Sequence, residues 1–286
     1  MTEVLTHSYD RELRVAVDLA REAGARILEF YEQPITIEQK YELSYQEPVT
    51  QADRIANQLI VERIAQEFPD DGILAEESED TARRLTRPRV WMIDPLDGTN
   101  GFIDGNGDFA VQIGLAERGE AVLGVVYQPL KRLLYRAVRG QGTWIEHPDR
   151  KPEAARVSAE LDFSRMTLAA SRSHRSPRMD RVVKTIGVKQ EVQRGSVGIK
   201  VGLIVERQCD LYVHLSPRTK QWDSCAPQVI LTEAGGRFSD LFGKPITYNS
   251  PEVQHLNGLV ATNGIAHERV IEALRPLLVE FGRASV

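Results

Sequence analysis

Apolar residues recur at helical spacing in two segments near the start of the chain. The first segment, residues 8–32, has apolar side chains at positions that include Leu13, Val17 and Ile27, and the second covers residues 52–68. A period near 3.6 residues predicts two amphipathic helices that each bury one face. The segment between them, residues 34–48, alternates irregularly and predicts a loop or a weak hairpin.

Short apolar runs then predict a strand-rich middle of the chain, at residues 73–77, 90–94, 110–116, 121–127 and 132–138. Residues 140–156 are rich in glycine, proline and charge, so we expect a boundary there between two halves, residues 1–150 and 151–286. In the second half, strands at 166–171, 191–194, 210–215 and 258–263 alternate with helices at 176–187, 197–207, 225–236 and 267–281. Such alternation favours a sheet with helices on both faces.

The composition excludes several classes of protein. The 286 residues carry 41 acidic and 36 basic side chains, so the net charge of -5 provides no field to attract a nucleic-acid polymer or an anionic membrane. The only cysteines, Cys209 and Cys225, form no C-x-x-C pair, which indicates neither a disulfide framework nor a zinc site. Without a signal segment or an apolar stretch of ~18 residues, a soluble, cytoplasmic protein is expected.

Acidic residues gather where predicted strands end. The stretch WMIDPLDGTN, residues 91–100, closes an apolar strand with Asp94 and Asp97, while Glu76 and Glu77 end another strand and Asp223 stands just ahead of a predicted helix. Side chains at strand ends commonly reach a ligand in layered α/β sheets. Asp-Pro followed by Asp-Gly is also ordinary turn chemistry, so the position of these aspartates alone leaves both interpretations open.

Carboxylates from three distant segments point to a cation site if they converge. They would raise each other's pKa unless a positive charge lies among them, and oxygen ligands without histidine or thiol suit magnesium, manganese or calcium. Gly98 and Thr99 form a glycine turn entering a helix, whose backbone N–H groups suit a phosphate. The Thr99 hydroxyl is placed to act on a metal-bound water if an unligated acid supports it. Asp53 is the candidate, although it also fits an ordinary first-turn helix acid.

Four fragments in one order resemble the signature of the inositol monophosphatase-like superfamily. They are PVTQAD at 48–53, AEES at 75–78, DPLDGTNGF at 94–102 and WDSCA at 222–226. The order and spacing agree over nearly the whole chain. The resemblance implies an α/β fold built as a layered αβαβα sandwich of the inositol monophosphatase and fructose-1,6-bisphosphatase type. It also implies a homodimer and magnesium-dependent, lithium-sensitive hydrolysis of a phosphomonoester without a phosphoenzyme.

The resemblance also assigns roles to residues. The implied ligands of two or three Mg²⁺ ions are Glu76, Asp94, Asp97, Asp223 and the carbonyl of Leu96. Asp53 and Thr99 resemble the pair that activates the attacking water, with the amides of Gly98 and Thr99 on the phosphate. Glu47 departs from the family pattern, where many members have aspartate in this loop, so no role is assigned to it.

Three further segments resemble the 3'(2'),5'-bisphosphate nucleotidases of the CysQ type. They are SRSHRSPRMDRVV at 171–183, GSVGIK at 195–200 and DLYVHLSPRTKQWD at 210–223. The resemblance implies that Ser196 and Lys200 read a second phosphate and that His174 lies on the substrate side. Those enzymes often show G-S-S-x-K, whereas Ser196 here stands four residues before Lys200. Without the resemblance, Lys200 would be interpreted as a solvated helix lysine, and His174 with arginines 172, 175 and 178 as a solvated basic face.

The predicted activity is removal of the 3'-phosphate from adenosine 3',5'-bisphosphate, with its sulfated relative as a further candidate substrate. The expected partner is therefore a small anionic phosphomonoester. Hydrolysis of inositol-1-phosphate, and more distantly of fructose-1,6-bisphosphate, are the alternatives within the class. A regulatory phosphate- or metal-binding protein on an inactive scaffold is the alternative outside it, but a pure binder would not need Asp53 and Thr99 beside the acids.

Overall fold

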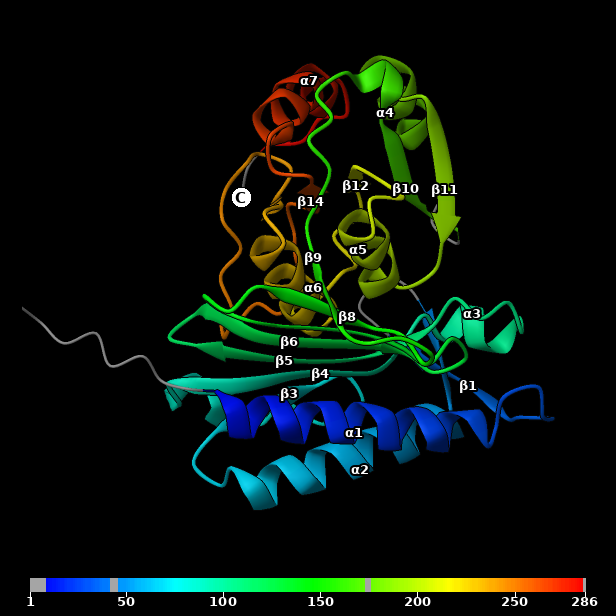
Figure 1. The fold of residues 1–286 in the computed structure, drawn as a ribbon, viewed down its shortest axis with the longest axis vertical. Helices are drawn as coiled ribbons and strands as arrows, with labels where there is room; N and C mark the ends of the chain where they lie inside the picture. Colours follow the sequence, from blue (N-terminus) through cyan, green and yellow to red (C-terminus); the bar gives the residue numbers. More distant parts are fainter. Residues whose placement is uncertain (1–8, 42–45, 173–175, 285–286) are drawn as a thin grey trace, which may run out of the picture.

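The computed structural model describes residues 9–41, 46–172 and 176–284. Figure 1 shows five layers, which are a helix pair, a sheet, a second helix pair, a second sheet and a third helix pair. The αβαβα sandwich expected from the sequence is confirmed. No helix within the described ranges is long and apolar enough to cross a membrane.

The first layer is the predicted pair of amphipathic helices, α1 (Asp10–Leu28) and α2 (Gln51–Glu67). Their buried faces carry small and branched side chains such as Ala20, Ala23 and Ile60, which pack on Trp91 and Ile93 of the first sheet. The hairpin predicted between the helices is present, because β1 (Ile37–Tyr41) pairs antiparallel with β2 (Gln46–Thr50). Hydrophobic burial on one helix face therefore sets the orientation of this layer.

The first sheet has seven strands in chain order. They are β3 (Gly72–Ala75), β4 (Arg89–Asp97), β5 (Ala110–Glu117), β6 (Glu120–Gln128), β7 (Leu133–Val138), β8 (Thr143–Glu146) and β9 (Glu153–Ala155). Strands β8 and β9 lie inside the predicted boundary at residues 140–156 and extend the sheet past residue 150. They were not predicted, because each is short and flanked by the glycine, proline and charge that indicated a linker. The division into two halves stays a prediction.

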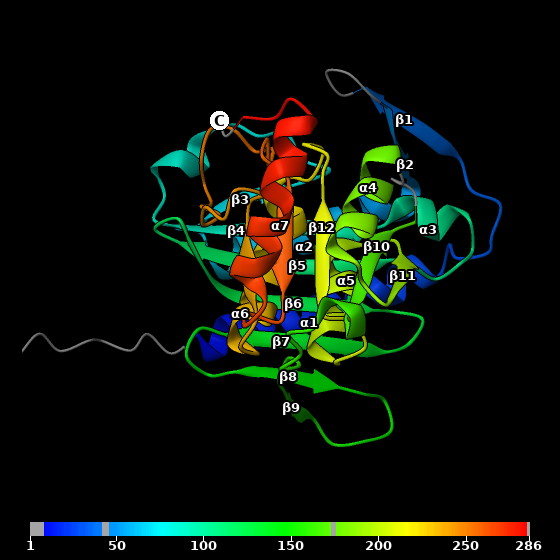
Figure 2. The same ribbon diagram turned by 90° about the horizontal axis from the view of Figure 1, so that it is seen from above.

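The second sheet has the order β11-β10-β12-β14-β13. Its strands are β10 (Thr167–Ser171), β11 (Gln190–Arg194), β12 (Leu211–His214), β13 (Arg237–Ser239), which was not predicted, and β14 (Leu259–Thr262). Helices α4 (Pro177–Ile186) and α7 (His267–Glu280) cover its outer face, and α5 (Val197–Val205) and α6 (Gln221–Glu233) lie between the two sheets. The predicted covering of both faces is confirmed. Figure 2 shows the strands of this sheet crossing over those of the first.

Helix α6 begins four residues earlier than the sequence indicated. Asp223, expected just ahead of the helix, lies in its first turn, where its Oδ2 accepts the backbone N–H of Lys220 at 2.7 Å. Asp53 occupies the same position in α2, with Oδ2 accepting the Thr50 amide at 2.8 Å. An acid at this position satisfies an otherwise unpaired amide at the helix start. Hydrogen bonds at the starts of the two helices thus hold both acids in the first helical turn.

His267 makes the stability of the fold depend on pH. Its ring nitrogens lie 3.0 Å from Thr262 Oγ1 and 2.9 Å from Ser239 Oγ, and burial lowers the pKa of His267 from 6.5 to about 4. As pH falls, the unfolded chain therefore takes up a proton on this histidine before the folded protein does. The stabilisation of the folded state by neutral His267 is complete above pH 6.5 and is lost as pH falls towards 4. We expect His267→Gln to remove about 3 kcal/mol of the pH dependence of unfolding in that window. Urea unfolding at pH 7 and pH 4.5, with His147→Gln as control, measures it; an unchanged pH dependence contradicts the prediction.

Candidate active site

A β-bulge brings the two aspartates of β4 to one cavity. In a regular strand, residues three positions apart point to opposite faces. The register between Asp94, opposite Gln112, and Asp97, opposite Ala110, matches three steps on β4 with two steps on β5. One extra residue reverses the alternation, and Pro95 within this stretch has no N–H to give to the ladder. Both aspartates consequently line the same cavity.

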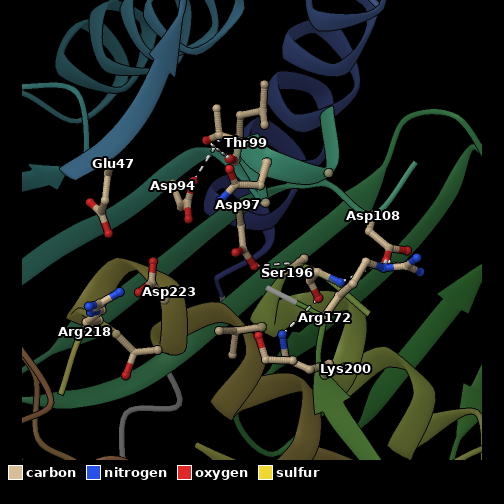
Figure 3. A pocket seen from close by; sticks show the side chains of 18 of the residues that line it. Glu47, Asp94, Asp97, Thr99, Asp108, Arg172, Ser196, Lys200, Arg218 and Asp223 are labelled. Carbon is tan, nitrogen blue, oxygen red and sulfur yellow. Dashed lines mark hydrogen bonds and ion pairs between the residues drawn. The ribbon is translucent and has the colours of Figure 1, made fainter. Parts of the chain in front are cut away.

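The predicted acids from three segments meet in this cavity of 270 Å³ (Figure 3). Glu76 follows β3, and its backbone N–H donates to Ile93 O at 3.0 Å, which places it beside Asp94. Asp223 reaches the cavity from the first turn of α6. The parallel pairing of β3 with β4 and the position of α6 against the sheet therefore create the convergence.

The carboxylates in this cavity repel one another. Burial, followed by the charges of Glu76, Asp97 and Asp223, raises the pKa of Asp94 well above its ordinary value. Burial and then Asp97 likewise raise the pKa of Asp223 well above its ordinary value. Burial also raises the pKa of Asp97, although Lys200 opposes that shift. Buried carboxylate oxygens with excess negative charge are the donor set that suits a hard divalent cation, so these residues fit magnesium.

Protein donors hold several of these carboxylates at present. Asp97 Oδ2 accepts bonds from Ser196 Oγ at 2.6 Å, Gln112 Nε2 at 2.6 Å and the Gly198 amide at 3.1 Å. Lys40 Nζ, on the β1–β2 hairpin, lies 2.9 Å from Glu76. Accordingly, within residues 9–41, 46–172 and 176–284 no three His, Cys, Asp or Glu side chains are already grouped around one point as a metal would require. The acids therefore line one cavity without their oxygens grouped around a single point.

Thr99 and Asp53 are joined across the site, as the sequence predicted for a water-activating pair. Thr99 Oγ1 donates to Asp53 Oδ1 at 3.1 Å and lies 3.3 Å from the carbonyl of Leu96. Asp53 is 1% exposed, and burial raises its pKa even though bonds from Thr50 oppose the shift. Asp53 is thus both the first-turn helix acid and the partner of Thr99.

Gly98 shapes the turn that leads into α3 (Thr99–Ile103). Its φ of +102° is a left-handed conformation that favours glycine. A Cβ at this position would lie 2.3 Å from the backbone oxygen of Asp108. Only glycine therefore fits, and the turn keeps Thr99 next to the carboxylates.

Lys200 and Ser196 form part of the cavity floor. Ser196 caps α5 by accepting the Ile199 amide at 3.1 Å while it donates to Asp97. Lys200 is 3% exposed, and its Nζ donates to Gly195 O at 2.9 Å and lies 5.0 Å from the Tyr212 ring. Burial lowers the pKa of Lys200 to about 8. The interpretation of Lys200 as a solvated lysine is therefore wrong, while His174 lies outside the described residues.

Lys220 and Arg218 at the cavity were not singled out from the sequence, whereas Arg172 was named there as part of a basic face. Lys220 Nζ pairs with Glu47, which had no assigned role, at 3.1 Å across 173 positions of the chain. Arg172 Nη2 pairs with Asp108 at 2.7 Å, and Arg218 lines the opposite side of the cavity, near Asp223 (Figure 3). No local pattern distinguishes these side chains from solvated ones.

Known proteins resemble this chain over most of its length. The Inositol monophosphatase family matches residues 8–278. The chain belongs to the inositol monophosphatase family. Its similar relatives include the 3'(2'),5'-bisphosphate nucleotidase CysQ of Salmonella typhimurium, 35% identical over 248 residues that cover 86% of this chain and 96% of the relative. The inositol-1-monophosphatase of Bacillus subtilis is 29% identical over 261 residues, or 90% and 94% of the two chains.

A solved member of the inositol monophosphatase family has the same fold. The structure of CysQ from Bacteroides thetaiotaomicron superposes with a TM-score of 0.74 at 29% identity and covers 90% of this chain and 98% of its own. The family expected from the four sequence fragments is confirmed.

Proposed function

We propose that this chain is a magnesium-dependent phosphatase that hydrolyses the 3'-phosphate of adenosine 3',5'-bisphosphate to adenosine 5'-phosphate and phosphate. Its coarser class, a phosphatase of the inositol monophosphatase family, follows from the family and from the named activities of its relatives. The observation that carries the reaction is the Thr99–Asp53 hydrogen bond beside four carboxylates of one cavity. A protein that only bound phosphate would have no use for this pair.

The metal would be held by Glu76, Asp94, Asp97, Asp223 and the carbonyl of Leu96. When bound, magnesium in such a site acts as a Lewis acid on phosphoryl oxygens and lowers the pKa of water. The number of ions, two or three, follows from the family resemblance and stays a prediction. Lys40 and Lys220, which now neutralise Glu76 and Glu47, lie where they would respond to the added positive charge.

Thr99 and Asp53 move the proton in the proposed mechanism. The attacking water gives a proton to Thr99 Oγ1 while Thr99 passes its own proton to Asp53 Oδ1, so the hydroxyl stays neutral. The raised pKa of Asp53 makes this carboxylate a better base than an exposed aspartate. The water oxygen bonds to phosphorus and the bond from phosphorus to the ribose oxygen breaks. The leaving ribose oxygen takes a proton from solvent water, and Asp53 returns its proton to solvent. The amides of Gly98 and Thr99 orient the cleaved phosphate, and Ser196 and Lys200 are proposed to hold the second phosphate of the substrate.

The choice of a bisphosphate rests on the positive charge around the cavity and on the relatives. Lys200, Arg172 and Arg218 line it together with the carboxylates, and a second phosphate would give these cations a substrate partner. Inositol-1-phosphate has no second phosphate for these cations. Relatives named 3'(2'),5'-bisphosphate nucleotidase are 30–35% identical, compared with 29% for the inositol-1-monophosphatase. His174 as a substrate contact, the homodimer and the cytoplasmic location stay predictions.

A hydrolysis assay tests the substrate. We expect phosphate release from adenosine 3',5'-bisphosphate to require magnesium and to exceed that from inositol-1-phosphate and fructose-1,6-bisphosphate in kcat/KM. Lithium, a small hard ion that enters oxygen sites without supplying the same charge, is expected to inhibit the reaction. A higher kcat/KM for inositol-1-phosphate would show that the protein is an inositol phosphatase and not a nucleotidase. No release of phosphate from any of these substrates would favour the regulatory binding protein.

A further inference from the structure

Arg84 is a buried arginine that lies outside the catalytic cavity. It belongs to η1 (Arg83–Thr86), a short 3-10 helix between β3 and β4, and is 2% exposed. Its packing against β3 is close, because a Cβ added at Gly72 would lie 2.9 Å from Arg84 Cβ. A charged side chain is almost never buried so completely unless it is paired. The partners of its guanidinium group therefore indicate what Arg84 does.

The Arg84 guanidinium joins two segments that are far apart in the sequence. On one side, its Nε and Nη2 donate to the Asp80 carboxylate, with Nη2 2.7 Å from Oδ2. On the other side, its Nη1 donates to Asn249 Oδ1 at 3.1 Å and to the Ser250 carbonyl at 3.0 Å. The Asn249 side chain donates in return to the Arg84 carbonyl at 3.0 Å. The planar fork of an arginine suits such a two-sided link, because its donors point in fixed directions.

Residues 249–254 support the start of α6. They form neither a helix nor a strand, so contacts with other segments must fix their position. The backbone N–H of Gln221, the first residue of α6, donates to Val253 O at 2.9 Å. The Gln221 side chain donates to Ser250 Oγ at 2.8 Å and accepts the Asn249 amide at 2.7 Å. The segment thereby satisfies an N–H group that has no partner within the helix, and it holds the first turn in place.

Each end of this link carries a residue expected to hold magnesium. Glu76 comes four residues before Asp80 in the sequence. Asp223 comes two residues after Gln221, in the first turn of α6. Burial, then Asp97 and then Glu76 raise the pKa of Asp223, so the two carboxylates at the ends of the link are close enough to repel each other. Contacts outside the cavity must therefore hold their segments together.

We propose that Arg84 is a positioning residue that fixes the first turn of α6, and with it Asp223, against the segment that carries Glu76. This inference rests on the proposed function, in which the two acids bind magnesium. Arg84 does not line the cavity, so it acts through Asn249 and Gln221. Substitution of residues that orient metal ligands from behind typically lowers metal affinity or activity by about 10–100-fold.

The test measures magnesium binding by calorimetry without substrate, at a temperature below the melting temperature of every variant. We expect Arg84→Gln and Asn249→Gly each to weaken magnesium binding by about tenfold. Asn249 has a φ of +57°, a left-handed conformation that glycine adopts freely. Asn249→Gly therefore removes the side-chain bonds to Arg84 without straining the backbone. Arg84→Lys keeps the charge but loses the fork, and should give an intermediate affinity.

A double variant distinguishes one shared link from two independent effects. If both side chains belong to one link, Arg84→Gln combined with Asn249→Gly should weaken binding no more than Arg84→Gln alone, whereas independent effects would multiply to about 100-fold. Arg89→Gln is the control, because it removes another partly buried ion pair, to Glu12 at 2.6 Å, at the start of β4. It should lower the melting temperature and leave the affinity for magnesium unchanged.

The outcomes separate this inference from the function on which it rests. Unchanged magnesium affinity in both single variants, or multiplied losses in the double variant, overturn the role of Arg84 even if the melting temperatures fall. If Arg84→Gln does not fold, the affinity of Asn249→Gly decides. A wild-type protein that prefers another phosphomonoester contradicts the proposed substrate without altering these affinities, whereas one that binds no magnesium contradicts both proposals.

Discussion

Asp97→Asn is expected to remove most of the magnesium-dependent activity while the fold stays intact. Asp97 is half-buried at the β4 bulge, and the three donors on its Oδ2 are Ser196, Gln112 and Gly198. An asparagine keeps one oxygen for these donors and leaves no cavity, but it loses the negative charge that a divalent cation requires. Substitution of a residue that only supports a metal ligand lowers metal affinity or activity by about 10–100-fold. Because Asp97 would itself be a ligand, we expect its substitution to lower kcat/KM by at least ~100-fold.

The measurement is kcat/KM as a function of magnesium concentration, together with the melting temperature. Asp223→Asn should behave in the same way, because its pKa is raised by burial and by Asp97. Asp104→Asn is the matched control, since Asp104 lines the same cavity, is exposed and has no assigned role. Full activity in Asp97→Asn would show that the acids are turn residues rather than metal ligands.

Thr99→Ala is expected to lower kcat by about 10²–10⁴-fold, the usual contribution of a positioned acid–base group. The Thr99 hydroxyl is hydrogen-bonded to Asp53 and lies beside the carboxylates. Without it, the base Asp53 loses its connection to the attacking water. The apparent affinity for magnesium should stay close to the wild-type value, because the resemblance assigns the hydroxyl to the water and not to an ion. Thr99→Ser keeps the hydroxyl and should retain most of the activity.

Two measurements distinguish this role from others. Calorimetric titration of magnesium into Thr99→Ala reports metal binding separately from turnover, and a loss of affinity equal to the loss of kcat would make the hydroxyl a metal ligand. Asp53→Asn should lower kcat similarly, but it also disturbs the bond to the Thr50 amide at the start of α2. Its melting temperature must therefore accompany its activity.

Local sequence patterns predicted the elements that bury one regular face. The periodicity of residues 8–32 corresponds to α1, and the alternation in the second half corresponds to helices on both faces of a sheet. Patterns were less informative at short edge strands such as β8 and β9, where flanking glycine and proline resemble a linker. The start of α6 was placed too late, because residues 221–224 are polar and aromatic rather than periodic and the helix is held by packing between two sheets.

The sequence by itself predicted which acids, which threonine and which glycine turn would come together, because motifs of adjacent residues encode backbone geometry and chemical type. Only the tertiary structure decided the burial and charge of those groups and which residues contact them. The bulge turns Asp94 and Asp97 to one face, and Lys200 is buried rather than solvated. Charge and partner depend on burial and on segments far apart in the chain, such as Glu47 with Lys220, and no local pattern records either.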